Sequence, residues 1–389
     1  MCHPARRSFS HYRHALLCTC LAGLSVSLLG CSGGTTRIEA DAPPPIDTTS
    51  AFDELGVNAD SATQMGYQLD WRGAPFLSAG ERIKFVREYN DIVAVLDTAG
   101  NLSFLDAQTG AYKGNRPVGL TSSDFLGVFR VGPTIFVTTE SEIFGVNVSS
   151  HDLVIRQKLA HIVSTGPAIA GGTLVFGTSS GAIRTHLLQS DAPYWSNGTD
   201  NPVLHDPLVV SSNTVTAVSE SGEILTMDAS SGATVGRAKI YAGPGADPIT
   251  GDGLLFIASK DQSLYCFAPG QREPIWRVRT QHPLEFAPTY HEAALYCTVP
   301  GQGMTKYDAL EGNVLWSRTE VEGTVVAQRR NTILVWNSGG ITVMDAEYGD
   351  VIREVPLPGA REVLATSFAD GPLIVIGKSG AIARLIPQF

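Results

Sequence analysis

Short apolar runs recur along the chain from about residue 67 onward, and each is followed by a polar turn. One kind of turn carries the phrase Asp-Ala-x-x-Gly, which starts at Asp106, Asp228, Asp308 and Asp345. An aspartate in this position can accept a hydrogen bond from a backbone N–H two residues on, and the glycine tolerates positive φ. Apolar residues flank each copy, as in ITVM before Asp345 and VLW after Asp308. Each copy therefore predicts a turn between two antiparallel strands.

The turn position repeats in degenerate form through the whole region. The eight reference positions lie at intervals of 37 to 41 residues: Asp106, Asn147, Leu188, Asp228, Ala268, Asp308, Asp345 and Ile386. Four prolines keep the same period, and each opens an apolar segment, as a proline at the first residue of a strand can do: Pro167, Pro207, Pro248 and Pro288. Four short strands in every unit of ~40 residues predict an all-β fold, an eight-bladed β-propeller.

The ends of the region predict how the ring closes. The last unit has its reference position at Ile386, three residues before Phe389, so it lacks the outer strand that carries Trp276 and Trp316 in other units. The segment YQLDWRG, residues 67–73, resembles such an outer strand, with Trp71 in the tryptophan position. We expect this strand to complete the last blade and to remove its exposed edge.

The N-terminal residues predict export and lipidation. A basic start is followed by an apolar run from Ala15 to Leu29, which is short for a membrane-spanning helix. The sequence Leu28-Leu29-Gly30-Cys31 resembles the bacterial lipobox, and the resemblance implies cleavage before Cys31 and attachment of lipid to its sulfur. An ordinary secretory signal is the alternative. The pair Arg6-Arg7 partly resembles a twin-arginine signal, so the export route stays open.

This pattern divides the chain into a signal peptide (1–30), a Pro-rich flexible tether behind the lipid anchor (31–66) and the propeller (67–389). The net charge is −10, and it becomes −13 without the first 30 residues, which hold three arginines and no acidic residue. An acidic body disfavours nucleic acid and anionic lipid headgroups as partners. The paired basic residues Arg329 and Arg330 are interpreted as a solvated turn.

Two cysteines, Cys266 and Cys297, remain in the exported body, where a disulfide is chemically permitted. We expect Ile257 to lie opposite Cys266 across the turn SKDQS, and Ile257 is the repeat equivalent of Cys297. Both sulfurs would then point the same way around the ring, separated by a blade, which is beyond the reach of a disulfide. The repeat thus predicts two free, buried thiols.

Two segments, IASKDQSLYCFAPGQREPIWRV and LYCTVPGQGMTKYDALEGNVLWSR, resemble the repeat of quinoprotein-type propellers, the PQQ-like repeat. Eight such blades behind a lipobox also resemble the BamB family, lipoproteins of the outer-membrane β-barrel assembly machinery. This resemblance implies a non-catalytic scaffold with a monomeric body, held by its lipid at the periplasmic side of the outer membrane, that docks protein partners of the envelope. It names no partner and no rim.

The enzyme hypothesis is a dehydrogenase that uses pyrroloquinoline quinone (PQQ). Such enzymes resemble this repeat but hold calcium and the quinone on long inserted loops, usually with a disulfide between neighbouring cysteines. Intervals of 37 to 41 residues leave no room for those loops, so we expect no cofactor and no catalysis. We expect no metal either, because the histidines of the body show no metal-ligand spacing: His151, His161, His186, His205, His282 and His291.

Binding of a peptide, a glycan or another small ligand is the remaining hypothesis. Asp206 and Asp247 each stand directly before a strand-opening proline, close to the expected mouth of the axial funnel. They are candidate ligand contacts, or caps of backbone amides. Tyr194 and Trp195 lie in the most aromatic-rich connection. Trp195 is either the usual outer-strand tryptophan of its blade or an exposed anchor for a partner.

Overall fold

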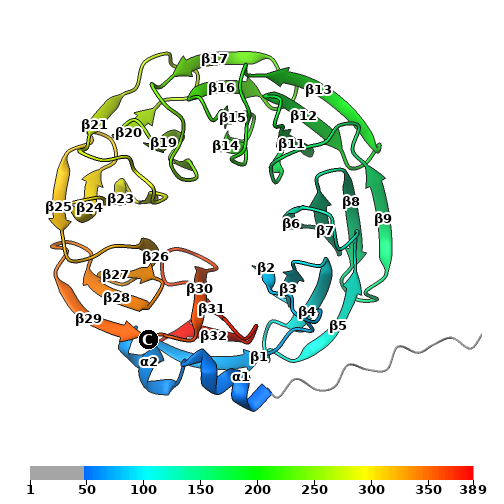
Figure 1. The fold of residues 1–389 in the computed structure, drawn as a ribbon, viewed down its shortest axis with the longest axis vertical. Helices are drawn as coiled ribbons and strands as arrows, with labels where there is room; N and C mark the ends of the chain where they lie inside the picture. The colour runs from blue at the N-terminus through cyan, green and yellow to red at the C-terminus, as the bar shows by residue number, and fades with distance from the viewer. Residues whose placement is uncertain (1–47, 389) are drawn as a thin grey trace, which may run out of the picture. The chain divides into compact units, whose positions relative to one another are not determined.

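The computed structural model describes residues 48–388, which form two short helices and 32 strands. The strands make eight antiparallel sheets of four strands each, and the sheets follow one another around a ring (Figure 1). The eight-bladed all-β propeller predicted from the repeat is therefore confirmed. We number the blades in chain order and describe each from its innermost to its outermost strand.

The first four blades comprise β2 (Ile83–Glu88), β3 (Ile92–Asp97), β4 (Asn101–Asp106) and β5 (Tyr112–Pro117); β6 (Phe125–Val131), β7 (Thr134–Thr139), β8 (Glu142–Asn147) and β9 (Leu153–Lys158); β10 (Ala168–Ala170), β11 (Thr173–Gly177), β12 (Ala182–Leu187) and β13 (Ala192–Gly198); and β14 (Leu208–Ser211), β15 (Thr214–Val218), β16 (Glu223–Asp228) and β17 (Thr234–Lys239).

The last four comprise β18 (Ile249–Gly251), β19 (Leu254–Ser259), β20 (Ser263–Phe267) and β21 (Trp276–Arg279); β22 (Thr289–His291), β23 (Ala294–Val299), β24 (Gly303–Asp308) and β25 (Val314–Arg318); β26 (Thr324–Arg329), β27 (Thr332–Asn337), β28 (Gly340–Asp345) and β29 (Val351–Pro356); and β30 (Ala360–Ala365), β31 (Leu373–Gly377), β32 (Ile382–Pro387) and β1 (Tyr67–Gly73).

The second strand of a blade is apolar without alternation because neighbouring blades cover both of its faces. Every residue of β3 and of β7 is buried, which is the burial expected of a strand that is packed on both sides. The third strands end at or next to the predicted reference positions. In blade 3 the reference position is Leu187 rather than Leu188, because Leu187 pairs with the first residue of β11 as Asp228 pairs with the first residue of β15. Four residues after Leu187, Asp191 has positive φ, as His151 has in blade 2.

The ring closes as predicted. Strand β1 pairs antiparallel with β32, from Tyr67 opposite Pro387 to Gly73 opposite Ile382, and becomes the outermost strand of blade 8. Figure 1 shows the N-terminal strand, in blue, beside the C-terminal strand, in red. Trp71 is buried between blades 8 and 1.

The repeated Asp-Ala-x-x-Gly turn joins adjacent blades. Oδ1 of Asp308 accepts hydrogen bonds from the backbone N–H groups of Leu310 and Glu311, each at 2.9 Å, and so holds the turn. The carbonyl of the next residue, Ala309, accepts a 3.0 Å bond from Nε1 of Trp276, which belongs to the outermost strand of the preceding blade. Trp71 and Trp195 donate to Ala107 and Ala229 in the same way, each at 2.9 Å. We call this contact the tryptophan latch.

Glycine is required in this turn because the tryptophan ring lies against it. Gly312 has φ +75°, and a Cβ atom there would lie 2.7 Å from the ring of Trp276. We expect Gly312→Ala to lower the free energy of unfolding by about 2 kcal/mol, from backbone strain and overpacking together. Gly301 is the matched control, with φ +81° and no atom within 4 Å of its Cβ position. If urea unfolding shows equal losses for Gly301→Ala and Gly312→Ala, the packing role of Gly312 is wrong.

Both cysteines of the body are free and buried, as predicted, but the predicted geometry is wrong. Cys266 lies opposite Phe256, and Ile257 lies opposite Tyr265, so the expected register was off by one residue. A shift of one residue moves a side chain to the other face of the sheet. Cys266 and Cys297 therefore share the apolar cluster between blades 5 and 6. Burial raises the pKa of each thiol to about 12.

Two helices lie within residues 31–66, the span predicted to be a flexible tether. Helix α1 (Thr48–Leu55) and helix α2 (Ala59–Gln64) pack on the propeller, and their buried side chains Ala51, Leu55 and Ala62 join the apolar cluster of blades 7 and 8. Asn58 and Ser61 form a capping box at the start of α2. Residues 31–47 of the tether, with Cys31 and the lipobox, lie outside the described residues. Neither helix of the described part is long and apolar enough to cross a membrane.

The prediction that Arg329 lies in a solvated turn is wrong, because Arg329 is only 6% exposed. Its guanidinium donates hydrogen bonds to the carbonyls of Gly66 and Gln388 and pairs with the carboxylate of Asp370. Gly66 directly precedes β1, and Gln388 directly follows β32. Arg329 of blade 7 therefore ties together the two chain segments that close the ring.

Candidate functional site

The two rims of the ring carry different kinds of loop. Because successive strands of a blade are antiparallel, the turn between its second and third strands lies on the same rim as the connection to the next blade. We call this side the connection rim. The Asp-Ala-x-x-Gly turns lie on the opposite side, which we call the turn rim. Asp206 and Asp247 precede β14 and β18, so both lie on the connection rim.

Asp247 belongs to a chain of charged and polar groups that bridges blades 4 and 5. Its Oδ1 lies 2.7 Å from Nδ1 of His205, and Nε2 of His205 lies 3.3 Å from Oε1 of Glu220. The other oxygen of Glu220 lies 3.1 Å from Nζ of Lys260. The hydrogen bond from His205 lowers the pKa of the Asp247 carboxyl. This chain fixes the relative position of two blades at the rim, and it leaves the carboxylate of Asp247 mostly exposed.

Asp206 makes the corresponding contact between blades 3 and 4. Its Oδ1 accepts a 2.7 Å hydrogen bond from the backbone N–H of Gly166, the residue at the same repeat position one blade earlier. The surrounding protein displaces water and raises the pKa of this carboxyl, while the positive charge of Arg87, on innermost strand β2, acts in the opposite direction. Asp206 thus caps a backbone amide, which was one of the two interpretations of the sequence.

Apolar side chains stand exposed on the same rim. Leu120, Ile162, Leu204 and Tyr241 are 67%, 65%, 50% and 83% exposed, and they occupy the four consecutive connections from blade 1 to blade 5. The Tyr241 ring is covered on one face by the guanidinium of Arg277, 5.0 Å from its centroid. The connections from blade 5 to blade 7 expose His282, Glu285, Glu320 and Glu322 instead. We call the four residues Leu120, Ile162, Leu204 and Tyr241 the apolar arc.

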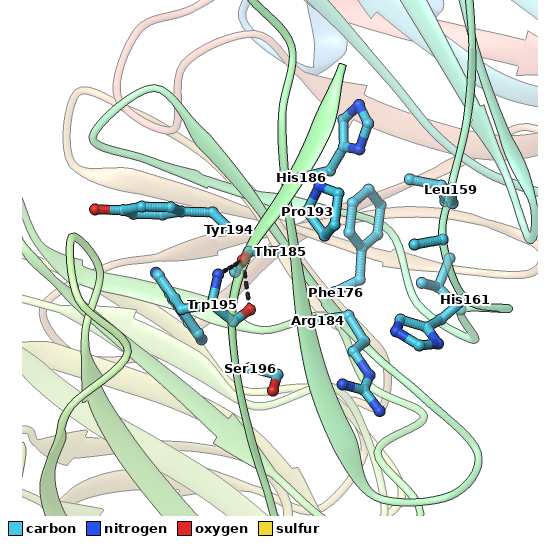
Figure 2. Close-up of a pocket in the computed structure, with 12 residues that line it drawn as sticks. Leu159, His161, Phe176, Arg184, Thr185, His186, Pro193, Tyr194, Trp195 and Ser196 are labelled. Carbon is cyan, nitrogen blue, oxygen red and sulfur yellow. Dashed lines mark hydrogen bonds between the residues drawn. The ribbon is translucent and has the colours of Figure 1, made fainter. Parts of the chain in front are cut away.

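Tyr194 and Trp195 lie away from the predicted funnel, on outermost strand β13. Trp195 makes the tryptophan latch to Ala229 and packs against blade 4, so its place is the usual one of an outer-strand tryptophan. Tyr194 is 56% exposed. Both residues border a cleft of about 210 Å³ between blades 2 and 3, but their rings point away from His161 and Arg184 across the strand (Figure 2).

Reasoning from the sequence missed the partners of Asp247 and the apolar arc. From the sequence, His205 was considered only as a metal ligand. Its contacts are with Glu220 and Asp247, which lie in neighbouring loops. Leu120, Ile162 and Leu204 follow one another at intervals of 42 residues and Tyr241 follows after 37, so the arc does not keep the intervals of the turn repeat, which did not reveal it. Within residues 48–388 no group of three or more histidine, cysteine, aspartate or glutamate side chains is arranged to hold a metal ion.

Comparisons with known proteins agree with this fold. Residues 220–380 match the family model described as outer membrane protein assembly factor BamB. Among solved structures, BamB from Moraxella catarrhalis is 17% identical, with a TM-score of 0.62 over 78% of this chain and 93% of that one. The computationally designed Ika8 protein is 13% identical, with a TM-score of 0.66 over 82% of this chain and 99% of that one.

No curated protein gives a significant match to the chain. Residues 220–380 thus resemble the BamB family model, and the whole described fold resembles the propeller of the BamB structure. At 13% and 17% identity the two solved structures inform the fold alone.

Proposed function

We propose that this protein is a non-catalytic scaffold of the bacterial envelope that binds protein partners through the apolar arc of its connection rim. The match of residues 220–380 to an outer membrane protein assembly factor supports a role in outer-membrane protein assembly. The lipobox at Leu28, Leu29, Gly30 and Cys31 supports a lipid anchor in the outer membrane, with the propeller on the periplasmic side.

The observation that carries this proposal is the apolar arc. Single exposed apolar residues are common on protein surfaces, but several that gather on one side of a molecule mark an interaction surface. Here four of them occupy consecutive connections of one rim, with the charged chain of Asp247, His205, Glu220 and Lys260 beside them. A partner with an apolar patch bordered by polar groups fits such a surface.

The test is an affinity purification of the lipidated protein from mild detergent after brief crosslinking. The wild type is expected to recover an outer-membrane barrel-assembly protein in stoichiometric amount. The variant Leu204→Ser/Tyr241→Ser is expected to lose at least about 90% of that recovery, because a combined loss of about 1.4 kcal/mol in binding free energy already weakens the affinity about tenfold. The control variant Leu310→Ser/Tyr348→Ser changes two exposed residues of the same types on the turn rim and is expected to retain the partner.

Equal recovery by both variants would place the binding surface elsewhere. Recovery of the propeller alone from wild-type cells would contradict the scaffold and favour a lipoprotein that binds a small ligand or a glycan. The PQQ-dependent dehydrogenase is tested separately, by adding the quinone with calcium and following reduction of an electron-acceptor dye. We expect no dye reduction above the rate without protein.

A further inference from the structure

The contact between blades 2 and 3 departs from the rest of the ring. Arg184 and His186 of β12 face blade 2, opposite Phe176 and Leu174 of β11. At the position of His186 each of the other seven blades has an apolar or aromatic residue: Leu105, Val146, Met227, Phe267, Tyr307, Met344 and Leu385. At the position of Arg184 the others have uncharged residues: Ser103, Phe144, Leu225, Tyr265, Thr305, Thr342 and Ala383.

The tryptophan latch is absent from this contact, because blade 2 has Ile155 where blades 3, 5, 6 and 8 have tryptophan; blades 1, 4 and 7 also lack the tryptophan. At the contact between blades 2 and 3, the flank of blade 3 is partly uncovered. The open space is a cleft of about 210 Å³, with Leu159, Phe176 and Pro193 among the apolar residues of its lining. Since β13 and the residues after β9 border it, the cleft lies at the outer side of the ring.

His186 has a structural explanation in this altered contact. Nε2 of Gln157, on outermost strand β9, donates a 2.8 Å hydrogen bond to the carbonyl of Leu188, the acceptor that a latch tryptophan would use. The other side-chain atom, Oε1, lies 2.9 Å from Nε2 of His186. Burial lowers the pKa of His186 and so favours the neutral ring. Gln157 and His186 thus replace the missing latch as a pair.

Arg184 has no such explanation. Within the described part of the chain its guanidinium makes no hydrogen bond or ion pair, and its Nε is buried without an acceptor. Figure 2 shows the side chain extending along the cleft beside His161. An unpaired guanidinium in a partly apolar site is unfavourable unless an anion completes it, and a carboxylate matches its paired N–H groups.

We propose that the cleft between blades 2 and 3 is a binding site for a carboxylate attached to a small apolar group, with Arg184 as the anion-binding residue. The apolar part lies against Leu159, Phe176 and Pro193, and its size is limited by a volume of about 210 Å³. Two sources carry this chemistry: a free organic acid, and the C-terminal carboxylate of a peptide that ends in an apolar residue. The cleft borders the apolar arc, because its lining residues His161 and Val163 flank Ile162, but Ile162 does not line it and the binding site does not depend on the proposed scaffold function.

The test is isothermal titration calorimetry of the full-length protein with four probes. Phenylacetate represents the free acid and N-acetylleucine the chain terminus, and phenylacetamide and N-acetylleucinamide are their uncharged counterparts. Both acids are expected to bind at millimolar concentrations or better, and each amide at least about tenfold more weakly, because only the acid forms charge-assisted bonds to Arg184. Tighter binding of one acid identifies the source. Amides that bind as well as the acids, or four probes that all fail to bind, overturn the proposal.

The variant Arg184→Leu separates binding from folding. Blade 4 has Leu225 at the equivalent position, so this change is expected to leave the melting temperature unchanged or raise it while weakening acid binding at least about tenfold. The matched control is Arg272→Met, which removes an equal charge from an exposed turn and is expected to bind as the wild type does. Undiminished binding by Arg184→Leu would overturn the assignment of Arg184.

Discussion

Replacing Trp71 by alanine is expected to lower the free energy of unfolding by about 3–5 kcal/mol, the range for truncation of a buried aromatic residue. Trp71 is 6% exposed and packs with residues of blades 8 and 1. Its Nε1 also donates the latch hydrogen bond to the carbonyl of Ala107. The substitution therefore loosens β1 from blade 1, and β1 is the strand whose pairing with β32 closes the ring. Urea unfolding monitored by circular dichroism measures the loss.

The control is Trp276→Ala, which removes the same latch between blades 5 and 6, where the tryptophan-bearing strand β21 pairs with β20, its neighbour in the sequence. Both variants are expected to lose stability, but only Trp71→Ala should increase protease cleavage within 67–73, because detachment of β1 exposes that strand. Equal cleavage in both variants contradicts a special role for Trp71. A chain that starts at residue 74 and melts at the wild-type temperature would show that β1 does not close the ring.

Replacing Arg329 by methionine is expected to lower the free energy of unfolding by about 2–4 kcal/mol at pH 7. The change leaves the carbonyls of Gly66 and Gln388 without this donor and removes the partner of Asp370. We place the loss below that of a fully buried ion pair because the Asp370 side chain is half exposed and can be hydrated. Arg330→Met is the matched control, since it removes the neighbouring exposed charge and should cost less than about 0.5 kcal/mol.

The loss from Arg329→Met should also depend on pH. The hydrogen bond from Arg329 lowers the pKa of the Asp370 carboxyl in the folded protein. A carboxyl with a lowered folded pKa stabilises the fold above its unfolded pKa, and this stabilisation is lost as the pH falls through the folded value. The stability difference between wild type and Arg329→Met should therefore be largest above about pH 5 and narrow below about pH 4. A difference that is constant from pH 7 to pH 3 would contradict the pairing.

The sequence predicted the ring because its turn chemistry is local. Asp308 caps its own turn, and Gly312 has positive φ within the same five residues, so both features appear in the spacing of the phrase. The alanine of the phrase had no such explanation. Ala309 acts through its backbone carbonyl, which accepts the hydrogen bond of Trp276 from the preceding blade. This contact joins segments 33 residues apart and uses the backbone of Ala309, so the only sign of it in the sequence is that the side chain at this position is small.

Other features depended on the whole fold. The register of Cys266 depends on the exact length of the turn between β19 and β20, and a difference of one residue changes it. Composition alone does not fix that length. Arg329 resembles a surface residue until Gly66 and Gln388 are brought to it by closure of the ring. Helix α1 did leave a signal that was missed: Ala51 and Leu55 are four residues apart and both are buried. The candidate site was the least predictable part, because its residues come from separate loops.

The pairing of β1 with β32 has a consequence for how the chain folds. Tyr67 lies opposite Pro387, so the first strand of the propeller has no hydrogen-bonding partner until the last strand has been synthesised and brought beside it. Contacts of such large sequence separation are the slowest to form, since a long loop must close before they are gained. Blades 1 to 7 can assemble in order of synthesis, while the incomplete eighth blade keeps an unpaired edge. After β32 has been synthesised and before β1 pairs with it, the edge of β32 is open to other strands. A chaperone that shields strand edges would act at this step.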